Sequence, residues 1–188
     1  KPYQEDIVVA VECMFCWYWL ADICREHNIT FVLGHALYMK AIHGGKAKND
    51  KIDSAKIAKL LRGGMIPKAY VYPHEMRSTR DILRRRMYLM RKRSELNVHV
   101  QITNSQYNLP EIGKKISIKK NRVGVAERFT DTSVQKNVEL DLKTMDYLDG
   151  LLKELELFIV RTAKNHDANT LHLLRTVPGI GKILSLVI

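Results

Sequence analysis

A single uninterrupted stretch from His74 to about Gln106 constrains the fold more than any other part of the sequence. It contains neither Gly nor Pro. It therefore predicts one helix that is roughly 45–50 Å long. Met76, Leu83 and Met90 recur every seven residues along it. Because this spacing is typical of a helix that packs against another helix, we expect a second long helix to cover this one.

That second helix is predicted from residue 133 to about residue 165, with Gly150 as its one weak point. Its apolar residues alternate between three- and four-residue spacing, as in a coiled coil: Met145, Leu148, Leu152, Leu155 and Ile159. We expect the two long helices to pair antiparallel, within one chain or between two chains. Residues 108–131, which connect them, carry a proline, two glycines and several basic residues, and predict a basic loop.

The residues before the long helix predict an α/β arrangement. Residues 7–11 form an apolar run rich in β-branched side chains, which favours a buried, parallel strand. The further elements that we expect are a helix over 14–27, a strand over 30–34, a short helix over 35–43, a helix from Asp50 to about Arg62 and an extended piece over 69–73. A sheet of two or three strands is marginal by itself, so we expect further sequence ahead of Lys1.

Two aspartates stand at the start of the helix that follows the second strand. Asp50 and Asp53 are three residues apart, so both carboxylates lie on one face of that helix. Glu12 ends the first strand, at the edge where open α/β sheets place their sites. Paired carboxylates in a basic setting suit a hard divalent cation that also meets a polyanion. The alternative is that Asp50 is a helix-start charge, stabilised by the helix dipole, and that Asp53 is a solvated neighbour.

The net charge of +11 is confined to the middle of the chain. Residues 40–68 hold eight Lys or Arg against two Asp, and residues 75–106 hold eight against three acids. Clustered positive charge indicates a nucleic-acid partner, whereas a merely solvated surface interleaves both signs. The candidates for contacts to a nucleic-acid backbone are Lys40, Lys46, Lys48, Arg77, Arg80, Arg84 and Arg85. His35 is a further candidate for a phosphate contact, although a capping or surface role is the simpler explanation.

The cysteines and the hydropathy exclude other classes. The three cysteines are an odd number, which favours a reducing compartment. Cys13 and Cys16 lack a second pair of Cys or His at ligand spacing, so structural roles on a helix face explain them better than zinc. No apolar run approaches the ~20 residues that a helix needs to cross a bilayer, so we expect no membrane partner.

The last residues have the pattern of a helix-hairpin-helix turn. A helix is followed by Pro178-Gly179-Ile180-Gly181 and then by the apolar start of another helix, which we expect to continue beyond Ile188. Glycines let a backbone approach closely, and N–H groups at a helix start can hold a phosphate. Gly179, Gly181 and Lys182 are therefore nucleic-acid-binding candidates, with a plain helix–helix turn as the alternative.

Several motifs together give the chain a family resemblance. They are Val9-Ala10-Val11-Glu12, Trp17-Tyr18-Trp19-Leu20, Leu33-Gly34-His35-Ala36-Leu37-Tyr38-Met39-Lys40, Lys48-Asn49-Asp50-x-x-Asp53, Arg77-x-x-Arg80-Asp81 and Val177-Pro178-Gly179-Ile180-Gly181. Over essentially its whole length the chain resembles insertion-sequence transposases of the DEDD type, which are relatives of the pilin-gene inversion recombinases. The resemblance implies a partial RNase H/RuvC-like catalytic domain over 1–73, a coiled-coil region over 74–166, and the start of a helix-hairpin-helix domain over 167–188.

The same resemblance implies roles for the acidic residues. The family holds divalent metal with four acids, and Glu12, Asp50 and Asp53 match the second, third and fourth. The first acid would precede Lys1. The family's serine nucleophile would lie beyond the end of this chain, and Ser185 does not match it. We expect the three carboxylates to lie close enough to share Mg²⁺ or Mn²⁺.

For function, the resemblance implies a DNA transposase or site-specific recombinase that cleaves and exchanges strands with the help of metal. It further implies a structured noncoding guide RNA, a homo-oligomer (dimer or tetramer) and a cytoplasmic location on bacterial or archaeal DNA. This fragment by itself is expected to be inactive. Two other hypotheses stay open, namely a non-catalytic basic nucleic-acid-binding fragment and a structural coiled-coil protein without nucleic acid.

Overall fold

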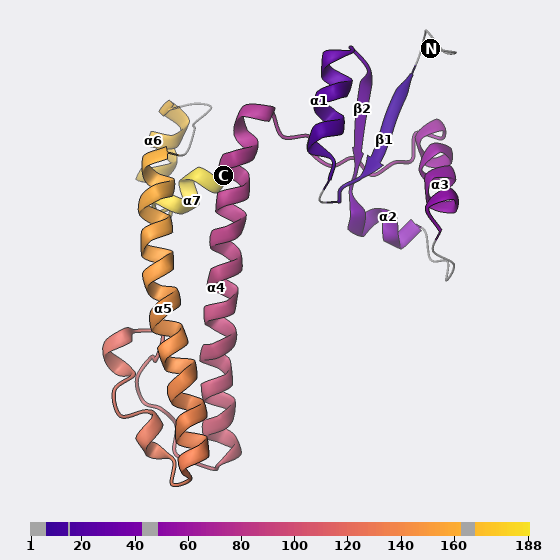
Figure 1. The fold of residues 1–188 in the computed structure, drawn as a ribbon. Helices are drawn as coiled ribbons and strands as arrows, with labels where there is room; N and C mark the ends of the chain where they lie inside the picture. The colour runs from indigo at the N-terminus through magenta and orange to yellow at the C-terminus, as the bar shows by residue number, and fades with distance from the viewer. Residues whose placement is uncertain (1–6, 15, 43–48, 163–167) are drawn as a thin grey trace. The chain divides into compact units, whose positions relative to one another are not determined.

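The computed structural model describes residues 7–14, 16–42, 49–162 and 168–188, and it divides into two compact units (Figure 1). The first unit spans Lys1–Glu75 and the second spans Met76–Ile188. The first is a mixed α/β unit, and the second is helical. None of the described helices is both long and apolar enough to cross a membrane.

The first unit is built on two parallel strands. β1 (Val8–Glu12) pairs with β2 (Thr30–Gly34) in a register that runs from Val8 opposite Thr30 to Glu12 opposite Gly34. Parallel strands need a crossover, and α1 (Tyr18–Glu26) supplies it. Trp17 and Leu33 form the core between α1 and the sheet. The helix expected over 14–27 therefore begins only at Tyr18.

Two further helices follow the second strand. α2 (Ala36–Ile42) comes directly after β2, and α3 (Asp50–Arg62) contacts β1. α3 begins where it does because the Asn49 side chain accepts a hydrogen bond from the Lys51 N–H at 2.9 Å. It ends at two glycines, of which Gly64 has a φ of +66°, a conformation that favours glycine.

The extended piece expected over 69–73 does not form a strand. The segment has only an isolated antiparallel bridge between Lys68 and Gly34, flanked by a hydrogen bond from the Ala69 N–H to the Leu33 carbonyl at 2.7 Å. Pro67 and Pro73 border the segment and carry no N–H group, so they cannot donate to a longer ladder. Within the described residues the sheet therefore has two strands.

The second unit is built on two long antiparallel helices of the same chain, which lie side by side in Figure 1. α4 spans His74–Gln106 and α5 spans Thr132–Thr162. α5 starts where the Asp131 carboxylate accepts hydrogen bonds from the N–H groups of Ser133 and Val134. Its buried face carries the apolar repeat seen in the sequence: Val138, Leu142, Met145, Leu148, Leu152 and Ile159.

A ladder of polar pairs joins the two long helices. Arg86 Nε donates to Glu156 Oε1 at 2.7 Å, Arg93 pairs with Asp149, and His99 Nδ1 lies 2.5 Å from Asp141 Oδ2. The residue numbers rise along α4 while those of the partners fall along α5, as an antiparallel pair requires. Ion pairs near a protein surface contribute about 0–1 kcal/mol each, and these pairs are partly buried. The ladder therefore specifies register more than it adds stability.

The segment between the long helices, residues 107–131, is an ordered lobe rather than an open loop, and we call it the insert. It contains two short 3-10 helices, η1 (Lys119–Asn121) and η2 (Ala126–Arg128). Its Ile116, Val125 and Phe129 are buried together with Val100 of α4 and Met145 of α5. The expectation of a basic loop was therefore incomplete, because the basic residues share the segment with an apolar core.

The chain ends in a helix–turn–helix arrangement. α6 (Ala168–Thr176) and α7 (Lys182–Val187) contact each other, and α7 also contacts α5. The turn between them is tight, since the Ile180 N–H donates to the Val177 carbonyl at 3.1 Å. Gly179 has a φ of +90°, which explains why the turn requires a glycine.

Candidate functional site

Glu12 lies at the carboxyl end of β1, where its backbone pairs with Gly34 of β2. The Cys13 N–H donates to the Gly34 carbonyl at 2.8 Å, so the chain stays in register just past the acid. A Cβ added at Gly34 would come within 2.2 Å of Met39 Sδ. The end of β1 is therefore closely packed against β2, and the backbone of Glu12 has a well-defined position.

Asp50 and Asp53 both lie in the first turn of α3, as expected. Asn49, rather than Asp50, supplies the N-cap. The Asp53 carboxylate forms an i,i+3 ion pair with Lys56 at 3.8 Å, and about half of the Asp53 side chain (49%) is exposed. Both acids stand where the helix dipole stabilises negative charge, so their contacts agree with the helix-start explanation as well as with a ligand role.

A metal site needs these carboxylates to converge. Carboxylate oxygens are suitable ligands for Mg²⁺ and Mn²⁺, so the chemistry of the three side chains fits such an ion. All three belong to the first unit, and α3 contacts β1. However, within the described ranges no group of three or more His, Cys, Asp or Glu side chains is close enough to hold a metal ion. The structure places Glu12, Asp50 and Asp53 in the expected elements without gathering them into one centre.

His35 directly follows Gly34, the last residue of β2, which pairs with Glu12. Its backbone N–H donates to the Pro67 carbonyl at 2.7 Å, and its ring packs on Tyr38 with 4.5 Å between centroids. Its Nδ1 is buried without a hydrogen-bond partner among the described residues.

The predicted basic residues differ in how far they reach solvent. Arg84 and Arg85 of α4 are exposed, and the Arg85 guanidinium lies 5.6 Å from the centre of the Tyr88 ring. Arg80 Nη1 lies 3.3 Å from an oxygen of Asp81. Arg77 is only 7% exposed and does not present its charge to solvent. Of the remaining candidates, Lys46 and Lys48 lie outside the described residues, and only the backbone of Lys40, in α2, is described.

The insert contains both kinds of basic residue. Arg122 is 5% exposed, and its guanidinium donates to Asp146 at 2.5 Å and to Asp149 at 2.6 Å. Lys114 and Lys115, in contrast, are exposed. The sequence pattern does not distinguish the buried arginine from the exposed lysines. Arg122 is buried because it pairs with acids of α5, which lie more than twenty residues further along the chain.

The C-terminal candidates occupy the turn between α6 and α7. Gly179 takes the positive φ, Gly181 is the N-cap residue of α7, and Lys182 is the first residue of that helix. Ser185 is buried and donates to the Lys182 carbonyl at 3.0 Å. This position agrees with the expectation that Ser185 is not the family's serine nucleophile. A phosphate-binding role for the turn remains a prediction.

Comparison with known proteins adds one finding. A protein-family model described as a transposase, that of the DEDD transposases of the IS110 type, matches residues 3–107. The matched segment contains both strands, the three candidate acids and all of α4. No curated protein and no solved structure matches the chain.

Proposed function

Because this chain belongs to the IS110-type DEDD transposase family, we propose that it supplies most of the catalytic half of a metal-dependent enzyme that cleaves and exchanges DNA strands of an insertion sequence. The observation that carries the proposal is the family match itself, which extends over Glu12, Asp50 and Asp53 and the basic α4. Membership of the family supports a transposase or recombinase role and DNA as the partner. The metal, the guide strand and the assembly are the proposed parts.

In this proposal Glu12, Asp50 and Asp53 are three of four acidic ligands. Bound Mg²⁺ or Mn²⁺ would neutralise phosphate charge and stabilise the leaving oxygen during strand cleavage. The chain's own contribution is to place one carboxylate at the end of β1 and two in the first turn of α3. Because these side chains are not gathered into one group in the structure, the proposal requires that the bound nucleic acid, the ion and the remaining acid bring them together.

The exposed cations of α4 would contact a nucleic-acid backbone. Arg84, Arg85 and Arg91 are exposed on this helix. Phosphate contacts provide affinity without reading sequence, so the choice of target would come from elsewhere, and a structured noncoding RNA is the guide that we propose. The turn that contains Gly179 and Gly181 would form part of a helix-hairpin-helix contact to phosphate. The enzyme would act as a dimer or tetramer.

The decisive experiment replaces Asp50 with Asn in the intact transposase and measures strand cleavage and exchange with Mg²⁺. Removing one ligand charge should lower the rate by roughly a hundredfold or more, the magnitude typical of a lost electrostatic stabiliser. Glu26→Gln is the matched control, since Glu26 is an exposed acid at the end of α1. Normal exchange rates in the Asp50→Asn protein would refute the ligand assignment.

One observation favours a second candidate function. The absence of a three-ligand group among the described residues agrees with a basic nucleic-acid-binding fragment that lacks catalytic activity. Titration with Mg²⁺ and Mn²⁺ separates the two, because an ion that binds only the folded chain raises the free energy of unfolding, by about 2.7 kcal/mol at a hundred times its Kd. A melting temperature that is independent of both ions would favour the binding fragment.

A further inference from the structure

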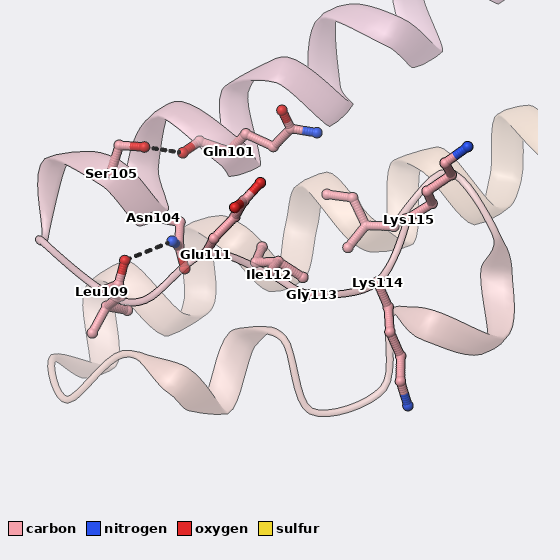
Figure 2. Close-up of a pocket in the computed structure, with 10 residues that line it drawn as sticks. Gln101, Asn104, Ser105, Leu109, Glu111, Ile112, Gly113, Lys114 and Lys115 are labelled. Atoms are coloured by element: carbon pink, nitrogen blue, oxygen red, sulfur yellow. Dashed lines mark hydrogen bonds between the residues drawn. The ribbon is translucent and has the colours of Figure 1, made fainter.

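The insert and the end of α4 enclose a pocket that the proposed function leaves unused. It has a volume of about 680 Å³ and lies between the last turns of α4 and residues 109–116 (Figure 2). Pockets of roughly 300–1,000 Å³ are typical of sites for small ligands and cofactors. Its walls combine polar and apolar side chains, among them Gln101, Asn104, Ser105, Leu109, Glu111 and Ile112.

Asn104 brings an unsatisfied acceptor to this pocket. The residue is 4% exposed, and its Nδ2 donates to the carbonyls of Leu109 and Pro110, each at 3.1 Å. Because both partners are carbonyl oxygens, the amide nitrogen has to face them, which orients Oδ1 away from them. Oδ1 is buried without a donor among the described residues. Such an acceptor is costly to leave unpaired, so an incoming N–H group would be favoured there.

The surrounding side chains divide into an interior and a rim. Figure 2 shows Gln101 and Glu111 extending into the same space, whereas Lys114 and Lys115 project away from the pocket in different directions. The side chains that face the pocket therefore offer hydrogen-bond acceptors, among them the carboxylate of the exposed Glu111, together with an amide and the apolar side chains of Leu109 and Ile112. The rim offers two exposed positive charges. A planar, uncharged group with N–H donors, attached to an anionic chain, is the ligand that satisfies both parts.

We propose that this pocket receives one unstacked nucleobase of a single-stranded nucleic acid, while the neighbouring phosphates contact Lys114 and Lys115. The inference rests on the nucleic-acid partner of the proposed function. An exocyclic amino group of the base donates to Asn104 Oδ1, and Ile112 contacts the face of the base. Proteins recognise single strands in this way, by splayed bases that are hydrogen-bonded along their edges and by contacts to the backbone. A base inside a duplex cannot enter.

The test uses the 188-residue chain and fluorescein-labelled probes of about eight nucleotides, a typical site size for one module. The probes are a single-stranded RNA, a single-stranded DNA of the same sequence and the corresponding DNA duplex, with affinity measured by fluorescence anisotropy. Ser105→Leu fills the pocket from the exposed surface of α4, and Gln101→Leu does so independently. Ser78→Leu, an exposed serine elsewhere on α4, is the matched control.

The pocket-filling variants should bind single strands about tenfold more weakly, the loss expected for one base, and bind the duplex as before. Replacing Lys114 or Lys115 by Ala should weaken the salt dependence of single-strand binding. The slope of the logarithm of the binding constant against the logarithm of the salt concentration should become shallower by about 0.7 per lysine. Tighter binding of the RNA probe would identify a guide strand as the source of the base, and tighter binding of the DNA probe an exposed target strand.

Unchanged single-strand affinity in both pocket-filling variants, at unchanged melting temperature, would overturn the inference and leave Asn104 Oδ1 to an ordered water. An equal loss for single strands and duplex would also overturn it, because the pocket would then not select unpaired bases. If the unaltered chain binds neither form, the nucleic-acid role of this fragment fails together with the pocket. If the chain binds the duplex and the pocket-filling substitutions change no affinity, the pocket inference fails while the proposed function is retained.

Discussion

Arg122 illustrates, at the scale of single residues, that a basic side chain in this chain can be a structural one. Its guanidinium is buried and contacts Asp146, Asp149 and the carbonyl of Ile116, to which Nε donates at 2.9 Å. Taking a charge out of water costs several kcal/mol unless partners compensate it. Because the partners come from α5 and from the insert itself, Arg122 holds the insert against the helix pair.

Replacing Arg122 by Met should lower the free energy of unfolding by about 2–4 kcal/mol, because the two aspartates lose their buried partner and the insert loses its attachment. Urea unfolding followed by circular dichroism measures the change. Lys120→Met, at an exposed position of η1, is the control and should stay within about 0.5 kcal/mol of the unaltered chain. Equal stability of the two variants would contradict the assigned role.

Sequence reasoning predicted the elements of the candidate site better than the contacts of its residues. Glu12, Asp50 and Asp53 occupy the expected strand end and helix start because local periodicity and caps determine these positions. Arg77 and Arg84 are seven residues apart on α4, yet Arg77 is buried and Arg84 is exposed. Periodicity states which residues share a helix face, but not what covers that face, so burial and convergence could not be predicted.

At the scale of elements, the polar ladder between α4 and α5 determines how the two helices are aligned. Arg86, Arg93 and His99 meet their partners on α5 at intervals of about two turns. Apolar residues such as Met145 and Ile159 supply the burial, since both are fully buried. A shifted alignment would still bury apolar surface, but it would separate these polar pairs. The ladder therefore selects one register among several that burial alone would allow.

Exchanging the two charges of one pair should test that role. Arg86→Glu places a carboxylate opposite Glu156 and should destabilise the chain by about 1 kcal/mol, with a similar loss for Glu156→Arg. The double variant Arg86→Glu with Glu156→Arg should recover most of the loss, since it restores an attractive pair. Thermal unfolding of the four proteins provides the coupling energy, and strictly additive losses would show that the pair does not interact.

The elements themselves were predictable to different degrees. Both long helices follow from unbroken apolar repeats, and α5 covers Thr132–Thr162 of the expected 133–165, whose last three residues lie outside the described part of the chain. The insert was expected to be a loop because it carries a proline, two glycines and a cluster of basic residues. The burial of its Ile116, Val125 and Phe129 depends on α4 and α5, which frame them only after the chain has folded. Tertiary contacts, rather than local preference, made that segment ordered.

At the scale of the whole molecule, the two compact units differ in what stabilises them. As far as its residues are described, the first unit rests on a two-stranded parallel sheet with a small core around Trp17 and Leu33. The second rests on two helices of 33 and 31 residues with a core that extends through the insert. Sheets of two strands are marginal without added packing. We therefore expect the first unit to unfold more easily than the second.

The chain itself contains probes that can separate the two units. Both of its tryptophans, Trp17 and Trp19, belong to the first unit, whereas the longest helices belong to the second. In urea, tryptophan fluorescence should therefore change at a lower concentration than the far-ultraviolet circular dichroism, since non-coincident transitions indicate more than one cooperative unit. Coincident curves would show that the chain unfolds as one unit.

The attachment of the insert also bears on proteolysis. Trypsin cleaves after Lys and Arg, and the insert is rich in both. Its backbone is nevertheless held by side chains, since Asn121 Nδ2 donates to the Lys115 carbonyl at 3.0 Å and Arg93 donates to the Ser117 carbonyl. A protease needs a locally opened segment to fit its active-site cleft. The abundant cleavage positions of the insert would consequently stay protected until the lobe opens, and a host protease would start elsewhere on the chain.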